Sequence, residues 1–130
     1  MSLLLDTHFL IAATRGEADA RFPLVKRLLT DNPAPIHASV TSIWEIAIKT
    51  RLGKLEAAVP LDRIGTALER AGLKILDINR FHAVAYIEPE PETRDPFDRM
   101  LLAQCKVEGL KLVTADRALA GHPLVWRDDT

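Results

Sequence analysis

Four acidic residues lie at positions from which their carboxylates could bind a metal ion. Asp6 follows an apolar run at residues 3–5, and Asp116 comes shortly after another near the C-terminus. Glu45 interrupts a strongly apolar segment, and Asp98 opens a helical pattern. If these carboxylates converge, some must be protonated unless a cation lies among them. An all-oxygen donor set suits Mg²⁺ or Mn²⁺, and such a site supports phosphodiester hydrolysis by metal-activated water.

Each of these acids also has a purely structural interpretation. Asp6 and Asp116 fit helix N-caps, and Asp98 fits an acid in the first turn of a helix. Glu45 fits an ion pair with Lys49 one turn later on the same helix. The catalytic hypothesis therefore depends on the set of four and on no single member.

The elements that must position these acids follow from the apolar pattern, in which short apolar runs alternate with helical periods. The pattern predicts strands at 2–5, 36–38, 73–78 and 110–114 with an edge strand at 124–126, and helices after Asp6 and at 18–29, 39–52, 60–71, 79–86 and 95–107. This alternation predicts a three-layer α/β/α sandwich with a short, mainly parallel central sheet.

In an open α/β sheet, ligands bind at the carboxyl ends of the strands. Asp6 and Asp116 follow strands and should both lie at that edge. Asp98 precedes the helix that leads into the fourth strand. We expect that position to place it at the opposite end unless the preceding loop doubles back. The residues alone leave its approach to Asp6 open.

Composition limits the class of protein. The 130 residues suffice for a single domain, 1–130, with an ordinary core, since 48% are hydrophobic. A net charge of −1 argues against a general nucleic-acid coat protein, so any contact with nucleic acid needs a local group of charges or a metal. Cys105 is the single cysteine, which excludes an internal disulfide. No targeting signal or membrane-length apolar run is visible, so we expect a soluble, cytoplasmic protein.

Four segments resemble the motifs of PIN domains, in the expected order. They are residues 3–8 (LLLDTH), 42–49 (SIWEIAIK, followed by GKL at 53–55), 95–104 (DPFDRMLLAQ) and 112–116 (LVTAD). Within that family the chain resembles the VapC toxins of bacterial and archaeal toxin–antitoxin pairs. One position departs from the pattern, because many relatives carry a His before the Arg-Asp-Pro-Phe-Asp segment and this chain has Thr93.

The resemblance implies that Asp6, Glu45, Asp98 and Asp116 form the metal-binding catalytic cluster. Thr114 matches a position that lies beside the metal and helps to orient the site. The implied activity is a Mg²⁺- or Mn²⁺-dependent endoribonuclease, the toxin of a toxin–antitoxin module, which cleaves RNA to inhibit translation and growth. The implied partners are a cognate antitoxin protein and a second copy of the chain in a homodimer.

Several other residues have two interpretations. Arg94, Arg99 and Arg117 flank the acids and could hold phosphates, but surface charge explains each of them equally well. Lys49 and Lys54 are charge partners first and RNA contacts second. The pattern around Trp44 favours a place in the core or in a dimer interface over base stacking.

Two other functions remain open at this stage. One is a DNA structure-specific nuclease of the same fold, although the chain is short for the helical arch that such enzymes use. The other is a non-catalytic protein-binding module in which the acids are only helix caps. Cleavage of RNA against branched DNA, and Mn²⁺ binding, separate these alternatives from a ribonuclease.

Overall fold

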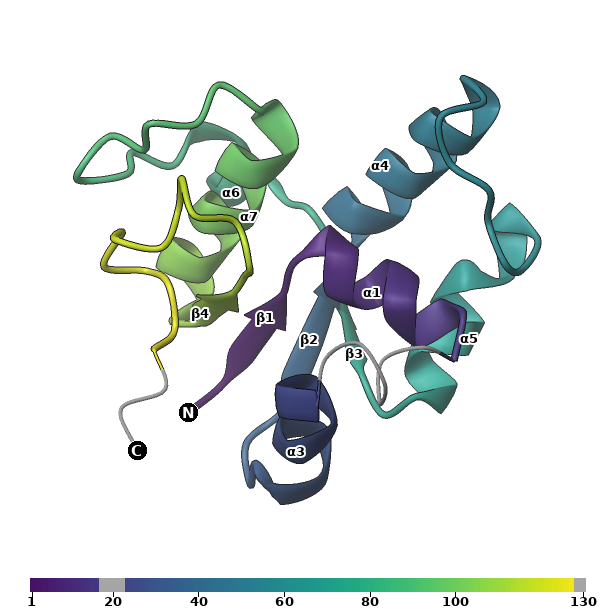
Figure 1. The fold of residues 1–130 in the computed structure, drawn as a ribbon. Helices are drawn as coiled ribbons and strands as arrows, with labels where there is room; N and C mark the ends of the chain where they lie inside the picture. Colours follow the sequence, from purple (N-terminus) through teal and green to yellow (C-terminus); the bar gives the residue numbers. More distant parts are fainter. Residues whose placement is uncertain (17–22, 128–130) are drawn as a thin grey trace.

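The computed structural model describes residues 1–16 and 23–127 (Figure 1). Strands and helices alternate along the chain, and within these residues no helix is both long and apolar enough to cross a bilayer. The strands are β1 (Leu3–Leu5), β2 (Ile36–Ser39), β3 (Lys74–Leu76) and β4 (Lys111–Val113). The helices are α1 (Thr7–Thr14), α3 (Pro23–Asp31), α4 (Val40–Arg51), α5 (Ile64–Arg70), α6 (Arg80–Val84) and α7 (Pro96–Glu108), with a 3₁₀ turn, η1 (Leu61–Arg63), before α5.

The four strands form one sheet in the order β3-β2-β1-β4, and all neighbouring pairs are parallel. Leu3 and Leu5 of the central strand β1 pack into a hydrophobic cluster that includes Leu68 of α5. Leu4 packs into a second cluster with Leu101 of α7. Because neighbouring side chains on a strand point to opposite faces, the apolar run at 3–5 fills both sides of the sheet.

The helices cover the two faces of the sheet. Figure 1 shows α6 and α7 on one side of the strands and α1 and α5 on the other. Helix α4 contacts both α1 and α7, so it reaches across the end of the sheet where β2 terminates. The chain is therefore a three-layer α/β/α sandwich with a parallel sheet, which confirms the predicted fold class.

The strand order creates a natural place for a site. The chain moves from β1 through β2 to β3 in one direction, whereas β4 lies on the other side of β1. The boundary between β1 and β4 is therefore the topological switch point of the sheet, the place where ligands bind in open α/β folds. Residues that directly follow these two strands lie beside it.

Three predicted elements differ from the structure. The segment 124–126 forms an isolated bridge to β4 and no strand, because the Val125 amide donates within a turn to the His122 carbonyl, at 3.0 Å. The helix expected at 60–71 begins as η1, where the Arg63 amide bonds to Pro60, and continues as α5. Residues 18–22 of the helix expected at 18–29 lie outside the described residues, and its remainder, α3, extends to Asp31.

A buried side-chain amide joins α7, the start of α4 and the segment after β3. The Gln104 side chain is 0% exposed, and its carbonyl oxygen accepts hydrogen bonds from the hydroxyls of Ser39 and Thr41. Its Nε2 donates to the Asp77 carbonyl, at 3.3 Å. Ser39 is also the N-cap of α4 and accepts from the Thr41 amide, at 2.9 Å. Gln104 therefore fixes α7 against the start of α4.

We expect Gln104→Leu to destabilise the protein although the side-chain volume is kept. The substitution leaves two hydroxyls and one carbonyl without this partner in a buried place, which costs roughly 2 to 4 kcal/mol of unfolding free energy. Urea unfolding followed by circular dichroism measures the loss. Glu69→Leu on the exposed surface of α5 is the control and should change stability by less than about 0.5 kcal/mol. Equal stability of the two variants would contradict a structural role for this amide.

Candidate active site

Asp6 lies at the junction of β1 and α1. Its carboxylate caps α1, with Oδ1 accepting from the Phe9 amide at 3.3 Å, and its other oxygen accepts from Thr114 Oγ1 at 2.5 Å. The residue is 5% exposed, and burial raises its pKa, although the hydrogen bonds from Thr114 and Phe9 oppose that shift. Asp6 is therefore both a helix cap and a buried acid at the carboxyl edge of the sheet.

Glu45 lies on α4 and is 5% exposed. Its Oε1 lies 2.7 Å from Thr7 Oγ1, and its Oε2 accepts from Lys49 Nζ at 2.5 Å. The hydroxyl of Thr7 also lies 2.9 Å from Ser42 Oγ. Because the single Thr7 proton goes to the carboxylate, Ser42 must donate to Thr7. The predicted pair with Lys49 is present, and Thr7, the residue next to Asp6, joins the start of α1 to Glu45.

Asp98 lies in the first turn of α7, at the same edge of the sheet as Asp6. Our expectation that it lies at the opposite end was wrong. Helix α7 leads directly into the parallel strand β4, so it must run antiparallel to β4 and begin at the carboxyl edge. Burial raises the pKa of Asp98 to about 6, and the negative charges of Asp95, Asp116 and Glu45 add to the effect.

Asp116 is exposed and follows β4. Its Oδ1 accepts from the Ala118 amide at 2.9 Å, so it caps the turn that follows. Its own amide donates to Thr114 Oγ1 at 3.0 Å, and the same hydroxyl donates to Asp6. Thr114 therefore connects the acid after β4 to the acid after β1.

Together these contacts bring the four predicted acids to one edge of the sheet. Within the described ranges, no group of three or more Asp, Glu, His or Cys side chains is arranged as a ready metal site. Three of the carboxylates are turned toward donors, namely Thr114 for Asp6, Lys49 for Glu45 and the Ala118 amide for Asp116. The donor chemistry still fits a hard divalent cation, because carboxylate oxygens are the ligands that such ions prefer, and Asp98, whose pKa is raised by burial and by nearby acids, lacks a neutralising charge.

The arginines near the acids have different surroundings. Arg99 Nη2 lies 3.8 Å from Glu90, and its buried Nη1 has no hydrogen-bond partner among the described atoms. Its side chain lines a hollow with His82 and Met100 between α6 and α7. Arg94 and Arg117 are exposed. The only contact of Arg99 with a charged group in the described structure is this link to the 87–95 loop, and no hydrogen bond joins it to the four acids.

Three hydroxyl residues around the acids were not predicted as parts of the site. Thr7 and Ser42 surround Glu45, and Thr93 Oγ1 donates to Asp98 Oδ2 at 3.4 Å. The signal for Ser42 was present, because it lies one helical turn before Glu45 on the same face. Thr93, which departs from the expected His, thus contacts the acid whose pKa is most clearly raised.

Comparisons with proteins of known structure agree with this architecture. The chain is similar to VapBC2 from Rickettsia felis bound to a promoter DNA fragment (16% identity, TM-score 0.65) and to a toxin–antitoxin complex from Klebsiella pneumoniae (22%, 0.63), each alignment covering 96% of both chains. It is also similar to VapC20 from Mycobacterium tuberculosis, described as a Sarcin–Ricin loop cleaving toxin (21%, 0.58), over 96% of this chain and 99% of that one. At these identities the likeness shows a common fold.

A search of curated proteins by sequence found no match. The sequence model of the PIN domain, in contrast, matches residues 3–122. That range includes all four acids and every strand of the sheet. The chain belongs to the PIN domain family.

Proposed function

We propose that this protein is a metal-dependent endoribonuclease and the toxin of a toxin–antitoxin module, which cleaves RNA to inhibit translation and growth. The observation that carries the proposal is the environment of Asp98. A half-buried carboxylate with a pKa of about 6 lies near the charges of Asp95, Asp116 and Glu45 at the carboxyl edge of the sheet. Perturbed acids at a topological switch point are typical of catalytic sites. The fold shared with VapC20, a toxin that cleaves an RNA loop, supports RNA as the substrate class.

Asp6, Glu45, Asp98 and Asp116 would hold the cation, which we propose to be Mg²⁺ or Mn²⁺. When bound, such an ion supplies Lewis-acid polarisation of a phosphoryl oxygen and a water of lowered pKa. The contribution of the chain is to hold the acids. Thr114 orients Asp6, while Thr7 and Lys49 hold the two oxygens of Glu45.

The proposed partners are a cognate antitoxin and a second copy of the chain, in the cytoplasm. Two of the similar structures are described as VapBC2 and as a toxin–antitoxin complex, which supports an antitoxin partner. Trp44 supports a protein interface, because its side chain is 56% exposed and therefore not in the core. Its ring packs edge-on against Phe97, with the centroids 5.5 Å apart. An exposed indole that is held in place by a neighbouring ring is typical of residues in protein–protein interfaces.

We expect Asp98→Asn to reduce RNA cleavage in the presence of Mn²⁺ by more than about 100-fold, because even groups that only support metal ligands are worth 10- to 100-fold. Cleavage of a labelled, structured RNA with Mn²⁺ or with EDTA measures the effect, and Asp6→Asn should behave in the same way. Branched DNA in parallel reactions tests the alternative substrate.

The matched control is Asp62→Asn, which removes an exposed acid on η1 and should cut RNA as the wild type does. Circular dichroism verifies that all variants fold. If Asp98→Asn cut RNA at the wild-type rate, the proposed site would be wrong. If the wild type neither cut RNA nor bound Mn²⁺, a non-catalytic binding module would replace the nuclease.

We also expect Asp98→Asn to stabilise the metal-free protein near neutral pH. The pKa of Asp98 is raised from 3.8 to about 6, so the folded state binds its proton more tightly than the unfolded chain. The charged carboxylate therefore lowers stability above pH 6, and this penalty disappears as the pH falls toward 4. The gain at about pH 7.5 should be on the order of 1 kcal/mol, because solvent screens this half-exposed group.

Thermal unfolding in EDTA at about pH 7.5 and pH 4 measures this difference. Mn²⁺ should raise the melting temperature of the wild type more than that of Asp98→Asn, because ligand binding to the folded state stabilises it. A variant that is less stable than the wild type in EDTA at both pH values would contradict the electrostatic interpretation of Asp98.

A further inference from the structure

A hollow of about 280 Å³ lies between α1 and α4, which contact each other. Its polar lining consists of His8, Arg15, Lys49 and Lys54, and we call it the basic hollow. No Asp or Glu of the described chain lines it. Three cationic side chains in one hollow are unusual in a protein whose net charge is −1.

The basic hollow is continuous with the acidic site. Lys49 Nζ binds Glu45 at 2.5 Å, and this hydrogen bond, followed by the charges of Asp95 and Asp98, raises the pKa of Lys49. On α1, His8 lies close enough to Asp6 to be among the groups that oppose the rise in its pKa caused by burial. The acidic site and the basic hollow are therefore neighbours, and Lys49 belongs to both.

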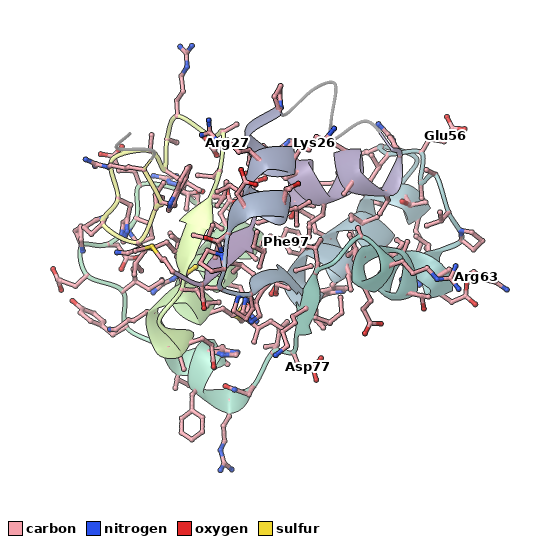
Figure 2. All side chains as sticks on the ribbon, turned by 90° about the horizontal axis from the view of Figure 1, so that it is seen from below. Lys26, Arg27, Glu56, Arg63, Asp77 and Phe97 are labelled. Atoms are coloured by element: carbon pink, nitrogen blue, oxygen red, sulfur yellow. The ribbon has the colours of Figure 1, made fainter. Side chains whose placement is uncertain are left out.

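The two outer cations have no acidic partner in the described structure. Arg15 donates through Nη2 to the backbone carbonyl of Glu56, at 2.7 Å. This hydrogen bond fixes the position of the guanidinium, and the uncharged carbonyl does not neutralise it. Figure 2 shows the Glu56 side chain projecting outward from the end of the molecule, as does that of Arg63. Lys54 is exposed and pairs with no carboxylate of the described residues.

The turn after α4 holds Lys54 at the hollow. Gly53 has a φ of +72°, which reverses the chain at the helix end, and the Lys54 amide donates to the Lys49 carbonyl at 2.9 Å. The sequence 53–55 (GKL) is the part of the second motif that the acidic site does not use. This part of the motif therefore places the Lys54 cation at the basic hollow, whereas the rest of the motif contributes Glu45 to the acidic site.

The floor of the basic hollow is apolar. Ile11 and Leu55 are half-buried and Ala12 is buried, all within the lining. Arginine and lysine side chains bind phosphate oxygens, and an apolar floor accepts the face of a ribose or base. A nucleotide next to the bond under attack presents these two chemistries together.

We propose that the basic hollow is a phosphate subsite for the RNA strand beside the scissile bond, with Arg15 and Lys54 as positioning residues. This inference rests on the proposed ribonuclease function. Lys49 is kept out of the test because it also holds Glu45. The double variant Arg15→Gln/Lys54→Gln removes the two outer cations, which pair with no carboxylate of the described residues, and leaves the four acids intact.

Affinity for a fluorescently labelled single-stranded RNA, measured by anisotropy in EDTA at increasing KCl, is the primary readout. Each lost phosphate contact should reduce the salt slope of log K by about 0.7. The double variant should therefore lose about 1.4 in slope and at least about tenfold in affinity at low salt. In Mn²⁺, the KM for RNA should rise by a similar factor while kcat stays within about threefold.

The matched control is Arg70→Gln/Lys74→Gln, which removes two exposed cations at the end of α5 and the start of β3. These residues lie at the opposite edge of the sheet, so the control should bind RNA as the wild type does. Equal RNA affinity in the two double variants would overturn the subsite and leave an acidic protein segment as the ligand for these cations.

The two proposals fail in different ways. RNA binding that is lost only in Arg15→Gln/Lys54→Gln, without metal-dependent cleavage by the wild type, would show that the basic hollow binds RNA but refute the nuclease, and with it a subsite beside a scissile bond. Metal-dependent cleavage with an unchanged KM in that variant would support the nuclease and refute the subsite.

Discussion

The parallel pairing of β1 with β4 is the contact on which the candidate site depends. The Asp6 amide donates to the Val113 carbonyl at 3.0 Å, so the residue after β1 is held beside the end of β4. In this register Thr114 reaches the Asp6 carboxylate and also accepts from the Asp116 amide. A slip of one residue would turn Asp6 to the other face and bury Leu4 on the wrong side. The two hydrophobic clusters therefore fix the register of the candidate site as well as the fold.

The acids that this register brings together impose a cost on the folded chain. Asp6 and Glu45 are buried, and each accepts hydrogen bonds, although for Asp6 these only partly offset the rise in pKa that burial causes. Asp98 has only the Thr93 hydroxyl, at 3.4 Å, and lies near other acids. Of the two carboxylates with a raised pKa, Asp98 has the weaker hydrogen-bond donors and therefore the greater need of a neutralising charge. The unfavourable free energy of holding acids together is offset by the hydrophobic clusters on the two faces of the sheet.

Local chemistry explains what the sequence could predict. Apolar runs gave the strands, and the caps Ser39, Asp95 and Gly109 fixed the ends of α4 and α7 within a residue or two. Long-range placement was harder. The position of Asp98 was mistaken because a helix that feeds a parallel strand must begin at the carboxyl edge, a constraint of topology and not of local pattern. The contact of Thr7 with Glu45 joins positions 38 residues apart, and no periodicity reports such a pair.

Near both α1 and α4, an acid of the candidate site is followed along the chain by a cation of the basic hollow. Asp6 precedes α1 and Arg15 follows it, whereas Glu45 lies within α4 and Lys54 lies in the turn after that helix. The two helices contact each other, and the cations that follow them line one hollow together with Lys49, the partner of Glu45. A chain with a net charge of −1 can therefore place a group of acids, which favours a cation, next to a group of cations, which favours an anion. Net charge is therefore a poor guide to what such a surface binds, because the local field at a site, and not the total charge, determines the affinity for a charged ligand.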